Sequence, residues 1–555
     1  MSLTVITLAV LAAFGGAYLV YSRLLAQTFA LDDATLTPAH ELNDGVDYCP
    51  TSQGMLAAQH FSAITAAGPI VGPITAGLMF GWVPALLWIV LGCIFIGAVH
   101  DFSALVASVR HKARSVAEVM REHTSGRAYY VFLSFIWLSL MYVIVAFTDL
   151  TAKAFLAKDP VLGAIGPGVA SSSVMYLALA FVLGVCFKKG LKTLPATLVF
   201  VPLLFAIVWL GQKLPISLPA FGSLGQHRAW ELLILVYCGF ASVAPLWSLL
   251  QPRGFLGGWF LYVTIGAGLV GLVFGSFFFS QGFTTTYPMF LGWGSGTKFL
   301  FPFLFVTIAC GACSGFHGIV CSGTTSKQID KEGHVRAVGY GSMLGEGVVA
   351  LISLACVMIL AKGYKGTPDA IYAKGIANFL RIFGIPAGIA VSFGTLAFAT
   401  FIFDTLDVCT RLGRQIFAEL FGIQGNLGRF LGTVVTLGIP AYFLMGATGD
   451  AWKTYWLVFG TSNQLLAGLT LLGITVWLMQ SKKSAWFVAL PMVFLIVTTM
   501  TSLVLFMKDA FAANANLQSR QVGVVAAVLL VLSLWLVVEA AMAMTKAASG
   551  RAAAA

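Results

Sequence analysis

Apolar runs long enough to cross a bilayer recur along the whole chain, and short polar segments separate them. A helix needs about 20 predominantly apolar residues to span the hydrocarbon core, so this pattern predicts an all-α integral membrane protein with about 15 transmembrane helices. The predicted spans are 3–22, 56–78, 83–108, 128–150, 172–188, 192–212, 229–250, 256–279, 298–322, 336–362, 386–408, 428–447, 453–478, 485–507 and 519–545.

Three predicted spans contain residues that interrupt a helix. The second has two Gly-Pro pairs within Gly68–Pro73, and the seventh has Pro245 in its middle. Proline removes an amide donor and clashes with the preceding turn, so we expect unwinding at Gly68–Pro73 and at Ala244–Pro245. The ninth runs into the polar sequence IACGACSGFHGIVCSGTTSKQ. Irregular backbone at membrane depth requires protein or a water-filled cavity around it.

The placement of these breaks predicts a secondary-transporter architecture. Spans two and seven are five helices apart, and an odd offset gives them opposite orientations, as in LeuT/APC-like inverted repeats whose discontinuous helices meet near the midplane. We expect an N-terminal helix and cytoplasmic loop at 1–55, a transporter core at 56–410 and further membrane helices at 411–555. Within the core, the two repeats would cover about 56–212 and 229–410.

Composition and charge narrow the class of protein further. Hydrophobic residues make up 59% of the 555 residues and charged residues only 10%, against about 25% charged residues in soluble domains. The net charge of +11 comes from Lys and Arg in short loops, which orient the helices with the N-terminus outside and the C-terminus inside, and it does not indicate a nucleic-acid partner. The sequence has no Walker A or HExxH motif, so we expect neither an ATPase domain nor an enzyme.

The polar part of span nine has more than one interpretation. Ser314 and Gly315 suit a close contact between helices, and they equally suit a substrate pathway. His317 is either a neutral core histidine or a proton carrier, because histidine titrates near neutral pH. A metal site made by His317 with the nearby cysteines is not expected, since one continuous helix cannot wrap four of its own side chains around an ion.

Three hydroxyl groups follow near the predicted cytoplasmic end of span nine, on Ser322, Thr324 and Thr325. Oxygen ligands suit a hard cation such as Na⁺, and carbonyl groups freed at Gly68–Pro73 would complete a cage. The alternative is that each hydroxyl bonds to the preceding turn of its own helix. The coupling ion, H⁺ or Na⁺, stays open, and we expect no other cofactor.

Other spans supply further ionisable and amide side chains. Asp404 and Asp407 share one helix face, and Arg411 follows Asp407 by one turn, which favours an Asp407–Arg411 pair. Asp101 and Arg110 lie toward the end of span three, where they suit an anchor or a gate.

The candidate residues fall into three groups. Candidate pathway residues are His60, Gly68, Pro69, Gly72, Pro73, Ser314, Gly315, His317, Asn463 and Gln464. Candidate ion-coupling residues are Ser322, Thr324, Thr325, Asp404 and Asp407, and candidate gate residues are Asp101, Arg110 and Arg411.

Seven pieces of the sequence together resemble the carbon starvation (CstA) family of transporters. They are LNDGVDYCPT, HFSAITAAGPIVGP, GAVHDF, CSGFHGIVCSGTTSKQ, GYGSMLGEG, TLDVCTRLGR and WLVFGTSNQLLAGL, in family order over roughly residues 10 to 480. Ser326 departs from the family pattern, because many members have Pro there. The resemblance implies a multi-pass carrier of the bacterial inner membrane that takes up peptides or pyruvate during carbon starvation.

These observations predict a secondary active transporter, a symporter that imports a small carboxylate-bearing nutrient, either peptide or pyruvate. The alternative is a membrane-embedded starvation sensor that binds a nutrient without transporting it. The expected partners are the small-molecule substrate and the lipid bilayer, and the sequence does not set the oligomeric state.

Overall fold

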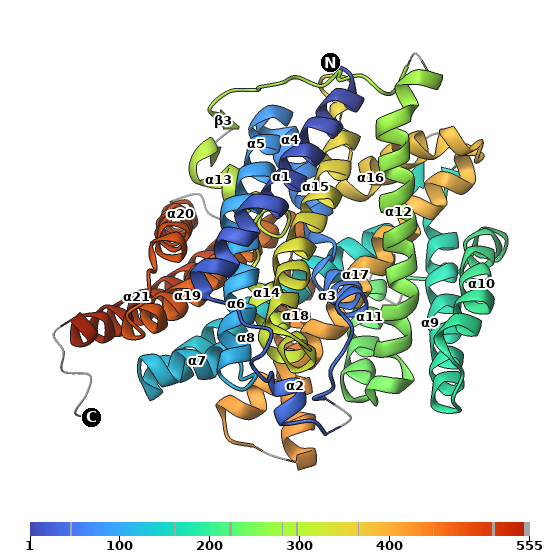
Figure 1. The fold of residues 1–555 in the computed structure, drawn as a ribbon. Coiled ribbons are helices and arrows are strands. Elements are labelled where there is room, and N and C mark those ends of the chain that lie inside the picture. Colours follow the sequence, from blue (N-terminus) through green and yellow to red (C-terminus); the bar gives the residue numbers. More distant parts are fainter. Residues whose placement is uncertain are drawn as a thin grey trace. The chain divides into compact units, whose positions relative to one another are not determined.

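The computed structural model describes residues 1–44, 47–159, 163–220, 225–279, 281–295, 298–364, 366–423, 425–447, 449–512 and 517–548. Almost all of the ordered structure is helical (Figure 1). The strands are two short antiparallel pairs, β1 (Lys158–Asp159) with β2 (Gly163–Ala164) and β3 (Gly294–Ser295) with β4 (Lys298–Phe299). The prediction of an all-α architecture is confirmed.

The α-helices follow one another along the whole chain. They are α1 (Leu3–Phe29), α2 (Pro38–Glu41), α3 (Gln53–Ile64), α4 (Gly68–Phe80), α5 (Trp82–Gly92), α6 (Ala98–Arg110), α7 (Val116–His123), α8 (Gly126–Ala154), α9 (Gly166–Lys188), α10 (Thr193–Lys213), α11 (Gln226–Val243), α12 (Leu250–Phe278), α13 (Leu300–Thr307), α14 (Gly315–Val320), α15 (Ser342–Met358), α16 (Pro368–Leu380), α17 (Ala387–Leu420), α18 (Gly425–Gly446), α19 (Ala451–Gln480), α20 (Trp486–Ala510) and α21 (Leu517–Ala548).

Every predicted span coincides with helical structure, but the number of full-length spans is smaller than 15. Among the described residues, 12 helices are long and apolar enough to cross a membrane, and the bent pair α3–α4 adds a thirteenth. The two remaining predicted spans are the seventh and the ninth. The seventh, α11, has only 18 residues and carries Arg228 and Glu231 in its first two turns. The ninth is divided into the short helices α13 and α14.

Span two is broken, although not where the sequence predicted. Helix α3 ends at Ile64 and α4 begins at Gly68, with a bend of 51° between them. Both Gly-Pro pairs therefore lie inside α4, and the break is at 65–67. The physical reason is that Pro69 occupies the first turn of α4, where its missing N–H would have no partner in any case.

Pro245 ends a helix and does not interrupt one. Helix α11 ends at Val243, and a 3₁₀ turn at 246–248 leads into α12. Arg411 donates hydrogen bonds to the carbonyl oxygens of Ala241 and Ala244, at 2.9 and 2.6 Å. These are carbonyl groups that a helix terminus leaves without partners, so Arg411 stabilises the end of α11.

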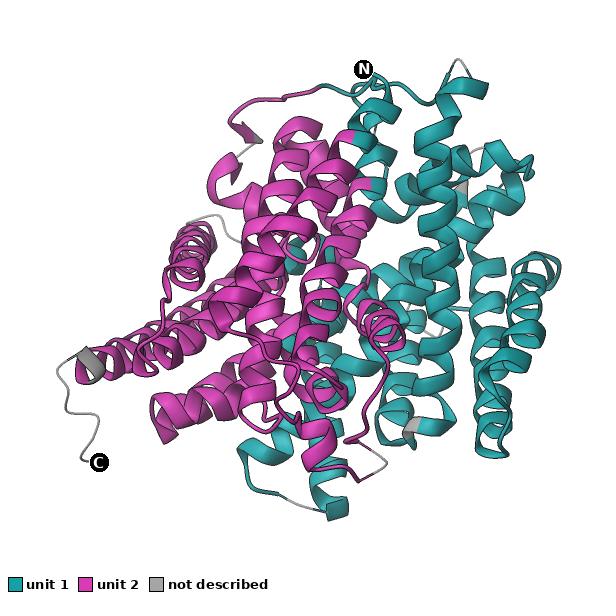
Figure 2. Cartoon of the chain, viewed as in Figure 1, with its two compact units in different colours: residues 1–8, 140–288, 352–456 teal, residues 9–139, 289–351, 457–555 magenta. Residues whose placement is uncertain are grey.

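The chain divides into two compact units, coloured separately in Figure 2. The first comprises residues 1–8, 140–288 and 352–456, and the second comprises residues 9–139, 289–351 and 457–555. Both broken spans, α3–α4 and α13–α14, belong to the second unit, and α4 packs against α13 there. The boundaries of the inverted repeats stay a prediction.

Candidate functional site

The break in span nine is enclosed by protein. Helix α13 ends at Thr307, α14 begins at Gly315, and the backbone between them is irregular. Its carbonyl groups still have donors: Gln464 Nε2 lies 2.8 Å from the Phe305 oxygen, and Trp88 Nε1 lies 3.1 Å from the Ile308 oxygen. Side chains of neighbouring helices thus replace the missing helical hydrogen bonds, as irregular backbone at membrane depth requires.

Asn463 of α19 closes the start of α14. Its Oδ1 accepts a hydrogen bond of 3.0 Å from the backbone N–H of Phe316. Its Nδ2 donates to Ser314 Oγ at 3.0 Å and to Cys310 Sγ at 3.2 Å. One buried amide therefore bonds to groups within the break and at the start of α14, and it occupies an N–H that would otherwise be free at a helix terminus.

Glycines allow the helices to approach this break closely. A Cβ atom on Gly72 would lie 2.6 Å from the carbonyl oxygen of Thr307, and one on Gly315 would lie 2.4 Å from the carbonyl oxygen of Asn463. A Cβ on Gly68 would lie 2.4 Å from the Cys310 side chain. The polar stretch of span nine faces protein, as predicted, and its small residues form close helix–helix contacts.

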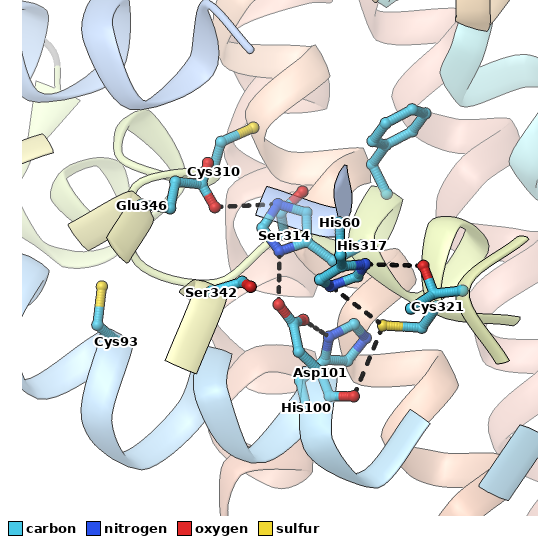
Figure 3. A network of polar contacts seen from close by, with 12 residues as sticks. His60, Cys93, His100, Asp101, Cys310, Ser314, His317, Cys321, Ser342 and Glu346 are labelled. Atoms are coloured by element: carbon cyan, nitrogen blue, oxygen red, sulfur yellow. Dashed lines mark hydrogen bonds and ion pairs between the residues drawn. The ribbon is translucent and has the colours of Figure 1, made fainter. Parts of the chain in front are cut away.

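A chain of buried ionisable side chains lies beside the break (Figure 3). His317 Nδ1 of α14 is 2.8 Å from Asp101 Oδ2 of α6, and His317 Nε2 is 3.1 Å from Glu346 Oε2 of α15. All three side chains are buried, with at most 1% of their surface exposed. Three helices therefore converge on one imidazole, which lies between two carboxyl groups.

The two carboxyl groups differ in their other partners. Asp101 Oδ1 is also 2.8 Å from His100 Nδ1. Within the described residues, neither oxygen of Glu346 has a partner in hydrogen-bonding geometry. A buried polar group without a partner raises the free energy of the folded protein. Of Asp101, His317 and Glu346, it is therefore Glu346 that most needs a proton or a ligand.

Three π-helical turns lie close in sequence to Asp101, His317 and Glu346. Cys93–Gly97 precedes Asp101, Cys321–Thr325 follows His317, and Arg336–Gly341 precedes Glu346. Such turns are rare in proteins and occur frequently at functional sites, because the extra residue redirects nearby side chains. Each of the three ionisable residues therefore lies within two turns of an irregularity in its own span.

The hydroxyl groups near the end of span nine are already bonded. Thr325 Oγ1 lies 2.9 Å from His60 Nδ1 of α3, which connects span nine to the first half of span two. Ser322 Oγ and Thr324 Oγ1 donate to carbonyl oxygens four residues earlier, at 2.8 and 3.1 Å. Ser322 Oγ also accepts from the N–H of Val116.

Asp101 and Arg110 do not act as a pair. Asp101 is fully buried in α6, about 13 Å of helix from Arg110. Arg110 instead makes two hydrogen bonds of 3.0 Å to Glu332 and donates to the Phe29 carbonyl oxygen at 2.8 Å. Asp101 therefore belongs to the buried chain, and Arg110 stabilises the end of α6.

The first unit contains a second buried charged cluster. Arg253 of α12 is almost completely buried and contacts both carboxylates predicted for ion coupling: Asp407, by a very short ion pair, and Asp404, at 2.7 Å. Tyr237 donates to Asp407 Oδ2 at 2.9 Å. The expected Asp407–Arg411 pair is not formed, because Arg253 pairs with Asp407 Oδ2 and Arg411 bonds to the end of α11.

Sequence reasoning missed two central residues, Glu346 and Arg253. Both are charged residues inside otherwise apolar runs, and such residues are functional candidates by default. Glu346 was visible in GYGSMLGEG, within the predicted span 336–362. The predicted spans place Arg253 in a loop, because one ends at 250 and the next begins at 256, whereas α12 begins at Leu250.

Comparison with known proteins places the chain in a family. The family model described as carbon starvation protein CstA matches residues 1–367 and 363–502. This chain belongs to the CstA family. A peptide transporter CstA from Campylobacter jejuni is 32% identical over 88% of this chain and 77% of its own length. The pyruvate/proton symporter BtsT of Escherichia coli is 28% identical over 90% of this chain and 81% of its own length.

A solved structure also aligns with most of the chain. A manganese transporter from Eremococcus coleocola covers 90% of this chain and 99% of its own, with 14% identity and a TM-score of 0.48. That score is too low to assign a shared fold. Family membership and the 12 candidate spans confirm the predicted location as a multi-pass protein of the inner membrane.

Proposed function

We propose that this chain is a proton-coupled secondary transporter that imports a small carboxylate-bearing nutrient, either peptides or pyruvate, and that it is not an enzyme. The names of its relatives support both substrates, since one is a peptide transporter and another a pyruvate/proton symporter. The observation that carries the proposal is the buried chain Asp101–His317–Glu346, which lies where two broken spans pack together.

The arrangement of Asp101, His317 and Glu346 suits proton movement. Ionised carboxylates accept hydrogen bonds only, so His317 can donate to both neighbours only as an imidazolium. If His317 is neutral, with its proton on Nδ1 toward Asp101, then Glu346 must hold a proton to donate to Nε2. Nε2 and Oε2 are 3.1 Å apart but are not aligned for a hydrogen bond in this structure, so one proton passes between them when a rotation of either side chain aligns the pair. Buried ionisable groups of this kind mark proton relays in transporters.

Protonation is linked to helix position through α14. This helix has only six residues, and it lies between the break of span nine and a π-helical turn. His317 connects it to both α6 and α15. Loss of the shared proton would leave two buried negative charges around a neutral imidazole, at a large cost in free energy. We infer that proton binding and release change how α14 is held.

The start of α14 is the proposed place for the substrate carboxylate. Asn463 Oδ1, an amide oxygen, accepts from the Phe316 N–H in this structure. A carboxylate oxygen is a stronger acceptor for the same N–H group, because charge-assisted hydrogen bonds are roughly twice as strong as neutral ones. A substrate that displaced Asn463 Oδ1 would release α19 from the break and thereby couple binding to helix movement.

Na⁺ coupling through Ser322, Thr324 and Thr325 is the alternative. Two of these hydroxyl groups bond to their own helix, and Thr325 bonds to His60. A hydroxyl group that donates its hydrogen keeps its lone pairs, so these hydrogen bonds alone do not prevent the oxygens from binding Na⁺. We favour the proton mechanism because the buried ionisable residues Asp101, His317 and Glu346 lie beside the break.

Uptake into proteoliposomes tests the proposal. Purified protein is reconstituted, and labelled pyruvate and labelled dipeptides are offered under an inward proton gradient, an inward Na⁺ gradient or neither. We expect one substrate class to accumulate with the proton gradient alone. Accumulation that requires Na⁺ would replace the proton mechanism with the sodium one. Binding without uptake under every condition would favour a starvation sensor, and chemical conversion of the substrate would indicate an enzyme.

A further inference from the structure

Two histidines and a glutamate meet where α6 and α7 end, away from the buried site. His111 directly follows α6, and Glu122 and His123 are the last two residues of α7. One potential ligand atom from each lies within 4.8 Å of the other two. A capping box holds α7 in place, since the Ser115 hydroxyl accepts from the Glu118 N–H and the Glu118 carboxylate accepts from the Ser115 N–H.

Hydrogen bonds fix the tautomer of both histidines. His111 Nδ1 lies 2.6 Å from the Ala107 carbonyl oxygen, which can only accept, so Nδ1 carries a proton. His123 Nδ1 lies 2.7 Å from Gln480 Oε1, and Gln480 Nε2 donates to the His123 carbonyl oxygen at 2.9 Å. The second bond fixes the orientation of the Gln480 amide, so His123 Nδ1 also carries a proton.

These tautomers leave two lone pairs facing each other. The Nε2 atoms of His111 and His123 are 2.8 Å apart. With both Nδ1 atoms protonated, neutral rings would bring two acceptors together without a donor. A cation must therefore lie between them, either a shared proton or a metal ion. Metal-binding histidines characteristically donate their other ring N–H to a carbonyl or carboxylate, and both rings do so here with amide oxygens.

We propose that His111, His123 and Glu122 form a binding site for a divalent transition-metal ion such as Zn²⁺. Zinc accepts imidazole nitrogen at about 2.0–2.1 Å and carboxylate oxygen at a similar distance, in tetrahedral geometry. Two nitrogens on such an ion are about 3.3 Å apart, so the rings need to separate by only about 0.5 Å. Three protein ligands leave a fourth position for water.

Glu122 is available to the ion despite its present partner. Its Oε2 lies 3.3 Å from Arg114, but both side chains are about half exposed, at 49% and 53%. Exposed ion pairs of this kind contribute little to stability. Exchanging Arg114 for a metal ion would therefore cost little free energy.

The site would connect helices that hold residues of the proposed transport mechanism. His111 follows the helix that holds Asp101, and Gln480, which orients His123, ends the helix that holds Asn463. A bound ion would join the ends of α6 and α7 and would hold both near the end of α19. A bound ion would therefore restrain α6, which holds Asp101, and α19, which holds Asn463.

Zn²⁺ titration of the purified full chain, with any affinity tag removed, tests the proposal. We expect one equivalent to bind, and we expect His111→Gln and His123→Gln each to weaken binding at least 10-fold. His40→Gln is the matched control, because His40 is another solvent-accessible histidine, 2.8 Å from Asp330. Absence of stoichiometric binding would show a shared proton only, and unchanged binding by a His111→Gln/His123→Gln double variant would place the ion elsewhere. Either result would overturn the proposal.

Gln480 gives a second test that keeps every ligand. As a positioning residue, it fixes the His123 tautomer through Nδ1. Gln480→Leu should weaken Zn²⁺ binding about 10- to 100-fold, as loss of such partners does at known sites. Gln480→Glu should restore binding, because a carboxylate also accepts from Nδ1. Zn²⁺ should raise the thermal unfolding midpoint of the wild type and of Gln480→Glu. Equal affinity in all three proteins would contradict the proposed geometry.

Discussion

Asp101 Oδ2 lies 2.8 Å from His317 Nδ1, and both side chains are buried. The two residues are 216 positions apart in the sequence. Their contact ties α6, which ends the third span, to the short helix that follows the break in the ninth. A hydrogen bond to an ionised group is stronger than a neutral one, so the protonation of His317 sets how firmly these two spans are joined.

Neutralising Glu346 should separate transport from energy coupling. Glu346→Gln retains the size of the side chain but cannot release a proton. Uptake driven by a proton gradient should fall at least 10-fold, while exchange of labelled for unlabelled substrate continues. Glu41→Gln, an exposed carboxylate on α2, is the control and should behave as the wild type. Full gradient-driven uptake by Glu346→Gln would remove Glu346 from the proton path.

Asn463→Leu should destabilise the break in span nine. The change leaves the N–H of Phe316 and the hydroxyl of Ser314 without their partner. Each buried group left unpaired costs about 1–3 kcal/mol, so the thermal unfolding midpoint in detergent should fall clearly. Gln226→Leu, which removes an exposed hydrogen bond of 2.9 Å, should have little effect. Equal midpoints for the two variants would show that Asn463 does not cap α14.

Span two and span nine show how much of this site the sequence could predict. Gly-Pro pairs in span two and polar and small residues in span nine predict irregular helices in both. His60, Asn463 and Gln464 lie beside these breaks, and their role in a substrate pathway stays a prediction. The partner of His317 was not predictable, because Asp101 and Glu346 approach it from two other helices. A hydropathy pattern reports the depth of each residue and carries no information on which helices are neighbours.

The position of each break was harder to predict than its existence. Proline inside an apolar run indicates an irregularity, but Pro69 begins a helix whereas Pro245 follows the end of one. The two prolines differ in whether the missing N–H would have had a partner. Whether the missing N–H would have had a partner depends on where the neighbouring helix starts, and the Gly-Pro pairs alone do not determine that starting residue.

Gly72→Ala should disturb the packing of span two against span nine. The new methyl group would lie 2.6 Å from the Thr307 carbonyl oxygen, a backbone atom that cannot move away cheaply. Overpacking of this kind costs about 1–3 kcal/mol. Gly16→Ala is the matched control, because no atom lies within 4 Å of its added Cβ, and alanine favours helix. The prediction fails if both variants unfold at the same temperature.

Arg253→Met should be far more damaging than removal of the whole ion pair. It leaves Asp407 buried without its cation, and such changes cost about 3–5 kcal/mol. The double variant Arg253→Met/Asp407→Leu removes both charges and should unfold at a temperature closer to the wild type. Thermal unfolding in detergent measures both. Arg253→Met as stable as the wild type would show that the cluster does not stabilise the first unit.

The most direct test of proton coupling compares two assays on His317→Gln in the same proteoliposomes. One measures accumulation of labelled substrate under an inward proton gradient, and the other measures counterflow without a gradient. Glutamine can still donate to one carboxylate but cannot carry a proton between Asp101 and Glu346. The account predicts that accumulation is lost while counterflow is retained. Accumulation with an unchanged dependence on the proton gradient would contradict it and would return His317 to a packing role.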